Sequence, residues 1–150
     1  MNDNLNDNTL VACAHCHRLN RVPTVRLAQG PVCGRCHAAL FTAHPLVLTA
    51  ASFDAHAMRA ELPLLVDFWA AWCGPCRTMA PQFEAAARKL EPQVRLAKVD
   101  SDAEPALSER YAIRSIPTLL LIRSGKELAR QSGVMSSADI VAWTRRVLGA

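Results

Sequence analysis

The chain has 150 residues, is 51% hydrophobic and carries a formal net charge of +4 at pH 7, a size that allows one core and a small extra module. The charge is spread evenly, because residues 1–45 hold four Arg against two Asp and residues 46–150 hold 13 Lys and Arg against 11 Asp and Glu. This balance excludes the basic patch of a nucleic-acid-binding or membrane-surface protein, so we expect neither kind of partner.

The N-terminal segment, residues 1–9, is polar and lacks the basic and apolar regions of a secretion signal. No later stretch is apolar enough to cross a bilayer, so we expect a cytoplasmic protein. In that reducing compartment the six cysteines are not expected to form structural disulfides. Their arrangement as three C-x-x-C pairs indicates metal binding or thiol redox chemistry.

Four of the cysteines lie in the polar segment 1–45, which we predict to be a separate module. They form two pairs that can hold one zinc ion tetrahedrally: Cys13, Cys16, Cys33 and Cys36. The segment has too little core to fold alone, and a structural zinc ion would supply the missing free energy. The stretch 18–32 contains turn-forming residues and is predicted to form a hairpin between the two pairs.

Both pairs are followed by histidine and so also match C-x-x-C-H, the attachment motif of haem c. Haem is disfavoured because its attachment follows export and because so short a segment cannot enclose two porphyrins. His15, His17 and His37 are alternative zinc ligands, but two cysteine pairs already complete a tetrahedral site. We expect these histidines to lie beside the metal, and a closed site of this kind to have no catalytic role.

From a boundary near His44-Pro45, residues 46–150 alternate between strand-like and helix-like patterns, which predicts an α/β domain. A short strand at 46–48 precedes a helix with Ser52 as its N-cap. A buried strand at 64–71 leads into a helix at 75–90. One face of that helix is apolar and is expected to be buried: Met79, Phe83, Ala86, Ala87 and Leu90.

A strand at 94–99 and a helix at 102–111 follow. Strands at 118–122 and 127–132 are separated by Ser124-Gly125, which predicts an antiparallel hairpin. The last helix begins at Ser136, with Asp139 in its first turn, and buries Ile140, Trp143 and Val147. This order predicts a mixed sheet with helices on both faces.

The third cysteine pair, Cys73-Gly74-Pro75-Cys76, lies where the buried strand gives way to a helix. The free N–H groups and the dipole of the helix N-terminus favour the thiolate of Cys73. Cys73 can therefore attack a substrate disulfide, and Cys76 can then attack the mixed disulfide and release the product. Pro75 suits a first helical turn, and Gly74 leaves the approach open. The alternatives are a third metal-binding pair or two buried unreactive thiols, and the position at a strand-to-helix junction disfavours both.

Asp67 is the only charged residue in the apolar run 64–71. An ionised carboxylate in a central strand is costly unless it is paired, so burial is expected to raise the pKa of Asp67. The alternative is an ordinary ion-paired carboxylate at a strand end.

The sequence Val-Asp-Phe-Trp-Ala-Ala-Trp-Cys-Gly-Pro-Cys at 66–76, followed by Pro81, Ile-Pro-Thr at 116–118 and Gly133, resembles the thioredoxin family over about residues 46–150. With the four-cysteine segment, the whole chain resembles the zinc-containing thioredoxin 2 subclass of bacteria. The resemblance implies a thioredoxin fold preceded by a zinc-ribbon-like module. It also implies a protein-disulfide reductase with a redox-active disulfide and no organic cofactor, which thioredoxin reductase reduces again. We expect it to act on disulfide-containing proteins as a monomer.

The resemblance also assigns roles to single residues. Asp67 would lie below the dithiol and exchange a proton with Cys76, with Lys98 as the partner of Asp67. Taken alone, Lys98 is an ordinary solvated lysine. Gly74 and Pro75 would belong to the substrate-binding surface.

The Ile116-Pro117 pair resembles the family's cis-proline segment, which faces the dithiol. It would present the backbone of Ile116 to an extended substrate, while Trp72 and Gly133 complete an apolar rim. Without the resemblance, Trp72 and Gly133 are packing or turn residues. Many thioredoxins carry glycine where this chain has Ser115, and we expect that difference to alter substrate fit.

Two other functions are compatible with these residues. A disulfide oxidase or isomerase would require an unusually stable dithiol, whereas Gly-Pro between the cysteines and the expected compartment resemble the reducing branch of the family. A redox sensor, in which oxidation of the zinc cysteines expels the metal, would be a layer added to the reductase.

Overall fold

A five-stranded mixed sheet forms the centre of the computed structural model, which describes residues 7–149. Its strands lie in the order β3-β5-β4-β6-β7. The bounds are Leu46–Val47 for β3, Leu64–Trp69 for β4, Arg95–Asp100 for β5, Thr118–Arg123 for β6 and Lys126–Ser132 for β7. β3, β4 and β5 run parallel, whereas β6 is antiparallel to both β4 and β7. The predicted mixed sheet and hairpin are confirmed.

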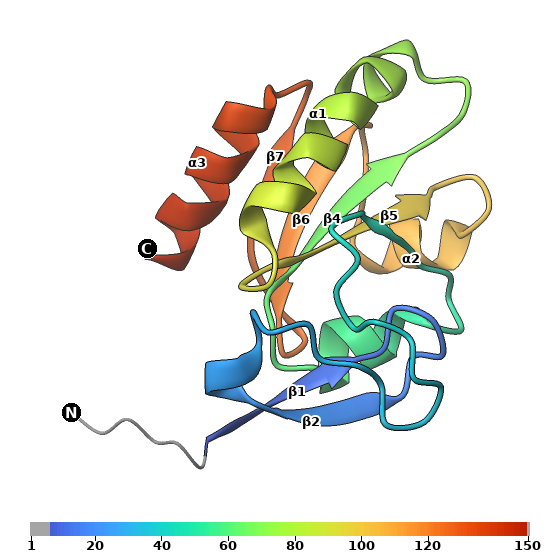
Figure 1. Cartoon of the computed structure of the whole chain (residues 1–150). Helices are drawn as coiled ribbons and strands as arrows, with labels where there is room; N and C mark the ends of the chain where they lie inside the picture. The colour runs from blue at the N-terminus through green and yellow to red at the C-terminus, as the bar shows by residue number, and fades with distance from the viewer. Residues whose placement is uncertain (1–6, 150) are drawn as a thin grey trace.

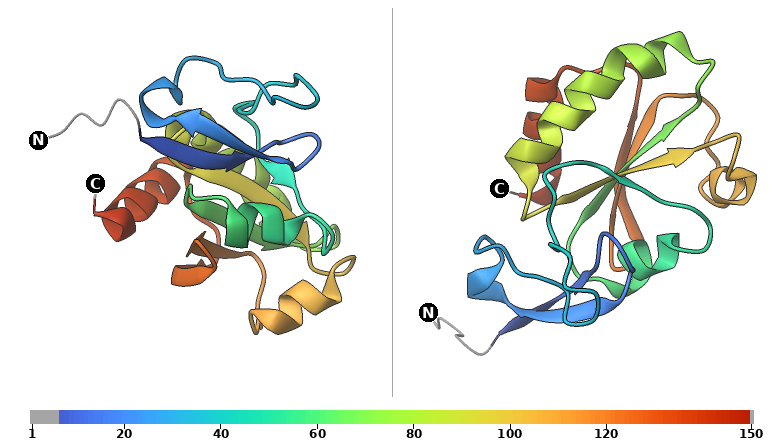
Figure 2. Two further views of the ribbon diagram at one scale, coloured as in Figure 1. Left: turned by 90° about the horizontal axis from the view of Figure 1, so that it is seen from below. Right: turned by 45° about the vertical axis from the view of Figure 1, so that its right-hand side comes forward.

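Helices cover both faces of this sheet, also as predicted (Figures 1 and 2). Their bounds are Gly74–Leu90 for α1, Pro105–Arg110 for α2, Ser137–Leu148 for α3 and Ala55–Arg59 for the short π-helix η2. α1 and α3 enclose one core with Leu65 of β4, and α2 and η2 enclose the other with Val66. Neighbouring strand residues divide between the cores because their side chains point to opposite faces.

The ends and faces of two helices agree with the sequence. α1 buries all five of the side chains that its periodicity selects: Met79, Phe83, Ala86, Ala87 and Leu90. α3 begins after Ser136, whose hydroxyl accepts a hydrogen bond from the Asp139 backbone N–H at 3.1 Å. Ile140 and Trp143 are buried, and Val147 is partly buried against the same core. Among the described residues, no helix has the length and apolar character that a membrane span requires.

Two helix predictions were wrong in detail. Ser52 does not cap a regular helix, because its hydroxyl accepts from the Thr49 backbone N–H at 3.0 Å and closes a turn. The following residues form η2, in which Ala60 donates to the Ala55 oxygen at 2.9 Å and both alanines pack against the N-terminal module. α2 is shorter than predicted because the Asp100 carboxylate holds residues 102–103 in a turn, and the helix begins only at Pro105.

The N-terminal module contains a two-stranded antiparallel sheet of β1 (Asn8–Ala12) and β2 (Leu19–Pro23). The prediction of a hairpin over 18–32 was therefore wrong. β2 pairs with the segment that precedes the first cysteine pair, because the turn from Cys13 to Arg18 closes with a backbone hydrogen bond of 2.8 Å. After β2 the chain forms the 3-10 helix η1 (Thr24–Arg26) and enters the second cysteine pair.

The module packs against residues that precede β4 and against residues just before and at the start of β5. Leu10 donates to the Glu61 carboxylate at 2.7 Å and accepts from the Glu61 backbone N–H at 2.9 Å. The buried Arg95 guanidinium donates to the Ala12 oxygen at 3.1 Å, and the Glu91 carboxylate accepts from the Ala43 N–H at 2.9 Å. The module thus lies at the end of the sheet opposite the loop that follows β4 (Figure 1).

Candidate redox and metal sites

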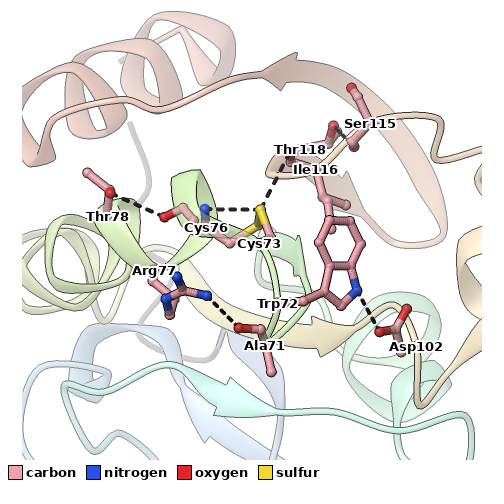
Figure 3. Close-up of a disulfide and its surroundings, with 11 residues drawn as sticks. Ala71, Trp72, Cys73, Cys76, Arg77, Thr78, Asp102, Ser115, Ile116 and Thr118 are labelled. Carbon is pink, nitrogen blue, oxygen red and sulfur yellow. Dashed lines mark hydrogen bonds between the residues drawn. A yellow bond between two sulfur atoms is a disulfide. The ribbon is translucent and has the colours of Figure 1, made fainter.

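Cys73 and Cys76 form a disulfide at the start of α1, with their Cα atoms 5.2 Å apart (Figure 3). Cys73 is the N-cap of the helix, and its sulfur accepts a hydrogen bond from the Cys76 backbone N–H at 3.2 Å. This donor stabilises negative charge on the Cys73 sulfur once the disulfide is reduced. The Arg77 guanidinium donates to the Ala71 oxygen at 2.7 Å and so holds the turn that carries Cys73, a contact that the sequence analysis missed.

The segment before β6 faces this disulfide. The backbone oxygen of Ile116 lies 3.9 Å from the Cys73 sulfur, and the Ile116–Pro117 peptide bond is cis, as the family resemblance implies. The Gly133 N–H donates to the Pro117 oxygen at 3.0 Å, which brings the end of β7 to the same segment. Gly133 has a φ of 99°, a conformation that glycine adopts without strain.

Trp72 stands beside the disulfide with 69% of its surface exposed. Its indole N–H donates to the Asp102 carboxylate at 2.8 Å, so the ring is held in one orientation (Figure 3). A groove of about 290 Å³ runs from Trp72 past α2 to Ile116. The sequence gives no signal for the role of Asp102, because its hydrogen bond with Trp72 depends on how two loops meet.

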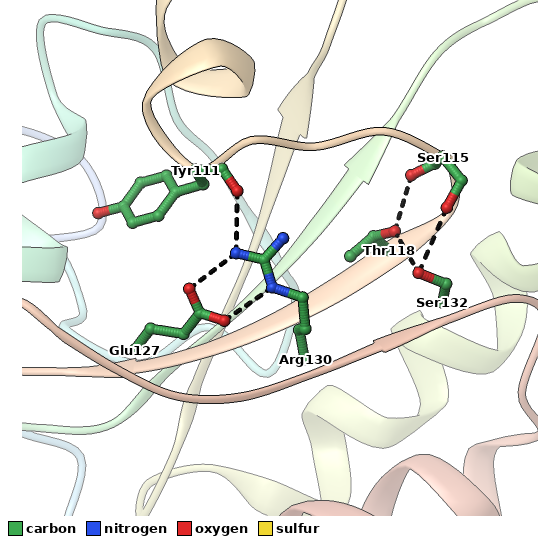
Figure 4. A network of polar contacts seen from close by, with 6 residues as sticks. All are labelled: Tyr111, Ser115, Thr118, Glu127, Arg130 and Ser132. Carbon is green, nitrogen blue, oxygen red and sulfur yellow. Dashed lines mark hydrogen bonds and ion pairs between the residues drawn. The ribbon is translucent and has the colours of Figure 1, made fainter.

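A hydroxyl network supports the Ile116–Pro117 segment (Figure 4). Thr118 donates to the Ser115 backbone oxygen at 2.7 Å, and its hydroxyl oxygen lies 2.9 Å from that of Ser132. The Ser115 hydroxyl donates to Ser132 at 3.3 Å. Ser115, the position that departs from the family's usual glycine, is therefore tied to the strand that leads to Gly133.

The loop that carries this segment is also fixed from its other end. Arg130 of β7 forms an ion pair with Glu127 at 2.7 Å and donates to the Tyr111 backbone oxygen at 2.8 Å (Figure 4). Such exposed pairs contribute little stability by themselves. Here the Arg130 guanidinium connects the end of α2 to the β6–β7 hairpin.

Asp67 lies in the middle of β4 with no surface exposed, and neither carboxylate oxygen has a hydrogen-bond partner among the described residues. Burial raises the pKa of Asp67 from 3.8 to about 7, although the positive charge of Lys98 opposes the shift. Lys98 is the β5 neighbour of Asp67, but its ammonium group lies 4.7 Å from the centre of the Trp69 ring. Asp67 is thus not the ion-paired carboxylate at a strand end that was the alternative interpretation.

The four N-terminal cysteines form a compact cluster, with all sulfurs within 4.8 Å of one another. The Cys13 and Cys36 sulfurs are 3.6 Å apart, and those of Cys16 and Cys33 are 3.7 Å apart. Zinc–sulfur bonds of about 2.3 Å in a tetrahedron place sulfurs about 3.8 Å apart, so the donor set fits zinc.

The surroundings of this cluster also suit thiolate ligands. The Cys13 sulfur accepts from the backbone N–H groups of His15 and Cys16, and the Cys33 sulfur accepts from that of Arg35. The side-chain cluster contains no histidine among the described residues. Instead, a ring nitrogen of His17 lies 3.0 Å from a ring nitrogen of the buried His56.

A family model described as Thioredoxin matches residues 44–146. The chain belongs to the thioredoxin family. A second model, described as Thioredoxin 2, N-terminal, matches residues 12–38, the segment with the four-cysteine cluster. This thioredoxin is accordingly a protein-disulfide oxidoreductase with the thioredoxin fold and a zinc-ribbon segment in front of it.

One similar protein matches nearly the whole of this thioredoxin, and others match a smaller part of it. Thioredoxin C-3 of Corynebacterium nephridii is 42% identical over 134 residues, which is 89% of the chain and 92% of the relative. Thioredoxin of Acidithiobacillus ferridurans is 44% identical over 92 residues, 61% of the chain and 85% of the relative. The solved structure of a mutant thioredoxin from Halobacterium salinarum NRC-1 has a TM-score of 0.64 at 27% identity and covers 71% of this chain and 93% of that one.

Proposed function

We propose that this thioredoxin reduces protein disulfides with Cys73 as the attacking sulfur and Cys76 as the resolving sulfur. The Cys73 thiolate attacks one substrate sulfur, forms a mixed disulfide and releases the other substrate sulfur as a thiolate. Cys76 then attacks Cys73, re-forms the Cys73–Cys76 disulfide and releases the second thiol, so two electrons reach the substrate. The observation that carries this assignment is the hydrogen bond from the Cys76 N–H to the Cys73 sulfur at the helix N-terminus.

The direction of electron flow follows from the family. We propose a flavoenzyme of the thioredoxin reductase class as the electron donor, with no organic cofactor on this chain and the cytoplasm as its compartment. The test is equilibration of the dithiol with glutathione buffers, followed by trapping of free thiols. A dithiol more reducing than glutathione is expected, and a strongly oxidising one would assign the protein to the oxidases.

Asp67 is proposed to take the proton of Cys76 as the mixed disulfide is resolved. It lies on the strand that leads directly into the dithiol loop, and its pKa of about 7 suits proton transfer near neutral pH. The positive charge of Lys98 lowers the pKa of Asp67 toward that range, so Lys98 is proposed as a positioning residue for this step.

Asp67→Ala is expected to make the folded protein more stable at pH 8 and to slow insulin reduction at least about tenfold. The pKa of Asp67 is about 7 in the folded protein and 3.8 as its ordinary value, so stability falls as pH rises between these values. The full cost above pH 7 is on the order of 4 kcal/mol, at about 1.36 kcal/mol for each pH unit. Urea unfolding at pH 8 and pH 5 measures the difference, which should shrink at the lower pH. A less stable variant with normal turnover would contradict the role.

Trp72, Gly74, Pro75, Ile116 and Gly133 are proposed to form the surface that receives an extended substrate segment. The exposed Trp72 ring and the groove beside it support this assignment. The cis-proline segment around Pro117 would then offer its backbone to the substrate strand.

Trp72→Ala is expected to raise the KM for insulin about tenfold and to change kcat little, because a large apolar contact with bound substrate is lost. Steady-state kinetics with coupled NADPH oxidation measures both constants. Asp102→Asn, which keeps the size of the ring's partner, is the milder control. A lower kcat with an unchanged KM would contradict this assignment, because it would show that Trp72 acts in the thiol-exchange step and not in substrate binding.

Residues 1–45 are proposed to form a separate module with one closed structural zinc ion held by Cys13, Cys16, Cys33 and Cys36, attached to a monomeric catalytic domain over 46–150. A redox-sensing role is the alternative within the same site. Peroxide treatment followed by measurement of zinc content and insulin turnover separates the two. If the site is purely structural, the insulin turnover per intact Cys73–Cys76 dithiol should not depend on how much zinc has been lost.

A further inference from the structure

An open groove of about 460 Å³ lies on the zinc module. It is lined by residues of β2, by Arg26 and by the segment 29–32 that leads into the second cysteine pair. The side chains of Arg21, Arg26 and Val32 are exposed there, Val32 by 56%. The disulfide chemistry described above uses none of these residues.

One border of the groove is a free strand edge. Backbone hydrogen bonds join Cys13 to Arg18 and Thr24 to Asp7, so every second residue pair of the β1–β2 ladder is hydrogen-bonded. Arg21 pairs with Leu10 between these positions, and its N–H and C=O therefore point away from β1. On the outer edge of β1 the corresponding groups of Leu10 bind Glu61. The backbone N–H and C=O of Arg21, by contrast, have no hydrogen-bond partner among the described residues.

The segment before the second cysteine pair has a similar edge. Val32 and Ala39 form an isolated antiparallel β-bridge. On either side of it, the Leu40 N–H donates to the Pro31 oxygen and the Cys33 N–H donates to the Ala38 oxygen. The N–H and C=O of Val32 therefore point away from Ala39. Arg21 and Val32 both line the groove, which thus borders on two backbone edges whose donors and acceptors have no partner within residues 7–149.

The charged residues that line the groove, Arg21 and Arg26, are both positive. Residues 8–53 contain four Arg and no Asp or Glu, and the exposed Arg21 and Arg26 form no ion pair with a described residue. A ligand for the groove should therefore be acidic. Single-stranded nucleic acid is disfavoured, because stacking needs exposed aromatic rings and the only Phe, Tyr or Trp in 7–45 is Phe41, which lies 4.9 Å from the Arg95 guanidinium.

We propose that the groove binds an extended acidic segment of a partner protein, which adds as a strand to the edge of β2 at Arg21. Backbone pairing would supply affinity, while Arg21 and Arg26 would select for Glu and Asp side chains. The module packs against a residue before β4 and against the first residue of β5, whereas Cys73 follows β4. Binding is therefore independent of the redox state of the dithiol, and a bound partner leaves the substrate surface open.

The test measures fluorescence anisotropy of a labelled peptide of alternating Glu and Val with the zinc-loaded full-length protein. Arg21→Glu with Arg26→Glu is expected to weaken binding at least about tenfold. The matched control, Arg18→Glu with Arg35→Glu, makes the same charge change on exposed residues of the module outside this groove and is expected to weaken it less than about threefold. Zinc content and insulin turnover should be normal in both variants.

Two further probes separate the modes of binding. The same peptide with N-methyl groups on alternate backbone amides should lose affinity, since it cannot pair with a strand edge. An RNA oligonucleotide should bind more weakly than the acidic peptide. Equal loss in both double variants, equal binding of the methylated peptide, or tighter binding of the RNA would each overturn the proposal.

Discussion

Cys73→Ser is expected to lower insulin reduction at least about a thousandfold, to the background rate of the assay. The serine hydroxyl cannot form the mixed disulfide, and the N–H groups at the start of α1 then face a group that stays neutral at pH 7. The measurement is NADPH oxidation in the presence of insulin and a thioredoxin reductase. Residual turnover within tenfold of the unchanged protein would show that another thiol begins the exchange.

Cys76→Ser is the matched control for this experiment. It keeps the attacking sulfur of Cys73 and removes the sulfur that releases the product. The expected result is a mixed disulfide between Cys73 and substrate that persists on a non-reducing gel and is located by mass spectrometry. The same adduct formed by the Cys73→Ser protein would reverse the two roles.

Removal of zinc is expected to unfold the N-terminal module and leave the catalytic domain folded. Among the described residues of this segment, the only buried apolar neighbours of the four cysteines are Val11, Val22 and Leu40, which form a very small core. Structural zinc contributes roughly 10 kcal/mol or more to such folds. Trypsin should then cleave rapidly at exposed arginines of the module such as Arg21 and Arg26, while a fragment over 46–149 resists. Limited proteolysis with and without a chelator, read by mass spectrometry, measures this.

Cys33→Ser and His15→Ala form a matched pair for the zinc experiment. The first removes a sulfur from the cluster and should cause the same loss of protection without any chelator. The second alters a histidine outside the sulfur cluster and should keep both zinc and protection. Zinc loss in His15→Ala, or a stable module in Cys33→Ser, would show that the ligand set is different.

The sequence predicts the sheet, the β6–β7 hairpin and the buried face of α1 because each depends on local periodicity. It does not predict η2, where Ala55 and Ala60 meet the N-terminal module, since that contact joins segments far apart in the chain. The hairpin at the start of the chain was missed for a related reason. The turn between Cys13 and Arg18 contains the first cysteine pair, and Asn8–Ala12 is only five residues long and shows no strict alternation of apolar and polar residues.

The functional sites likewise contain some residues that local sequence reveals and others that depend on contacts between distant segments. Short motifs locate both pairs of the four-cysteine cluster and the dithiol, and a single charge within an apolar run locates Asp67. The hydroxyls of Thr118 and Ser132, by contrast, meet only because β6 and β7 pair in one register. Arg95 gives no signal either, since an arginine at a strand start is ordinarily exposed and becomes a buried contact to Ala12 only when the module docks.

The zinc module packs against a residue before β4 and against the first residue of β5, so the molecule has two distinct ends. Thiol exchange takes place entirely at the end that carries Cys73. The other end is therefore suited to attachment, so the protein can be fixed to a bead or fused to a carrier through exposed residues of the zinc module without obstructing the catalytic face. An enzyme attached in this way should keep the turnover of the free enzyme, whereas attachment near Trp72 should abolish its disulfide-reducing activity.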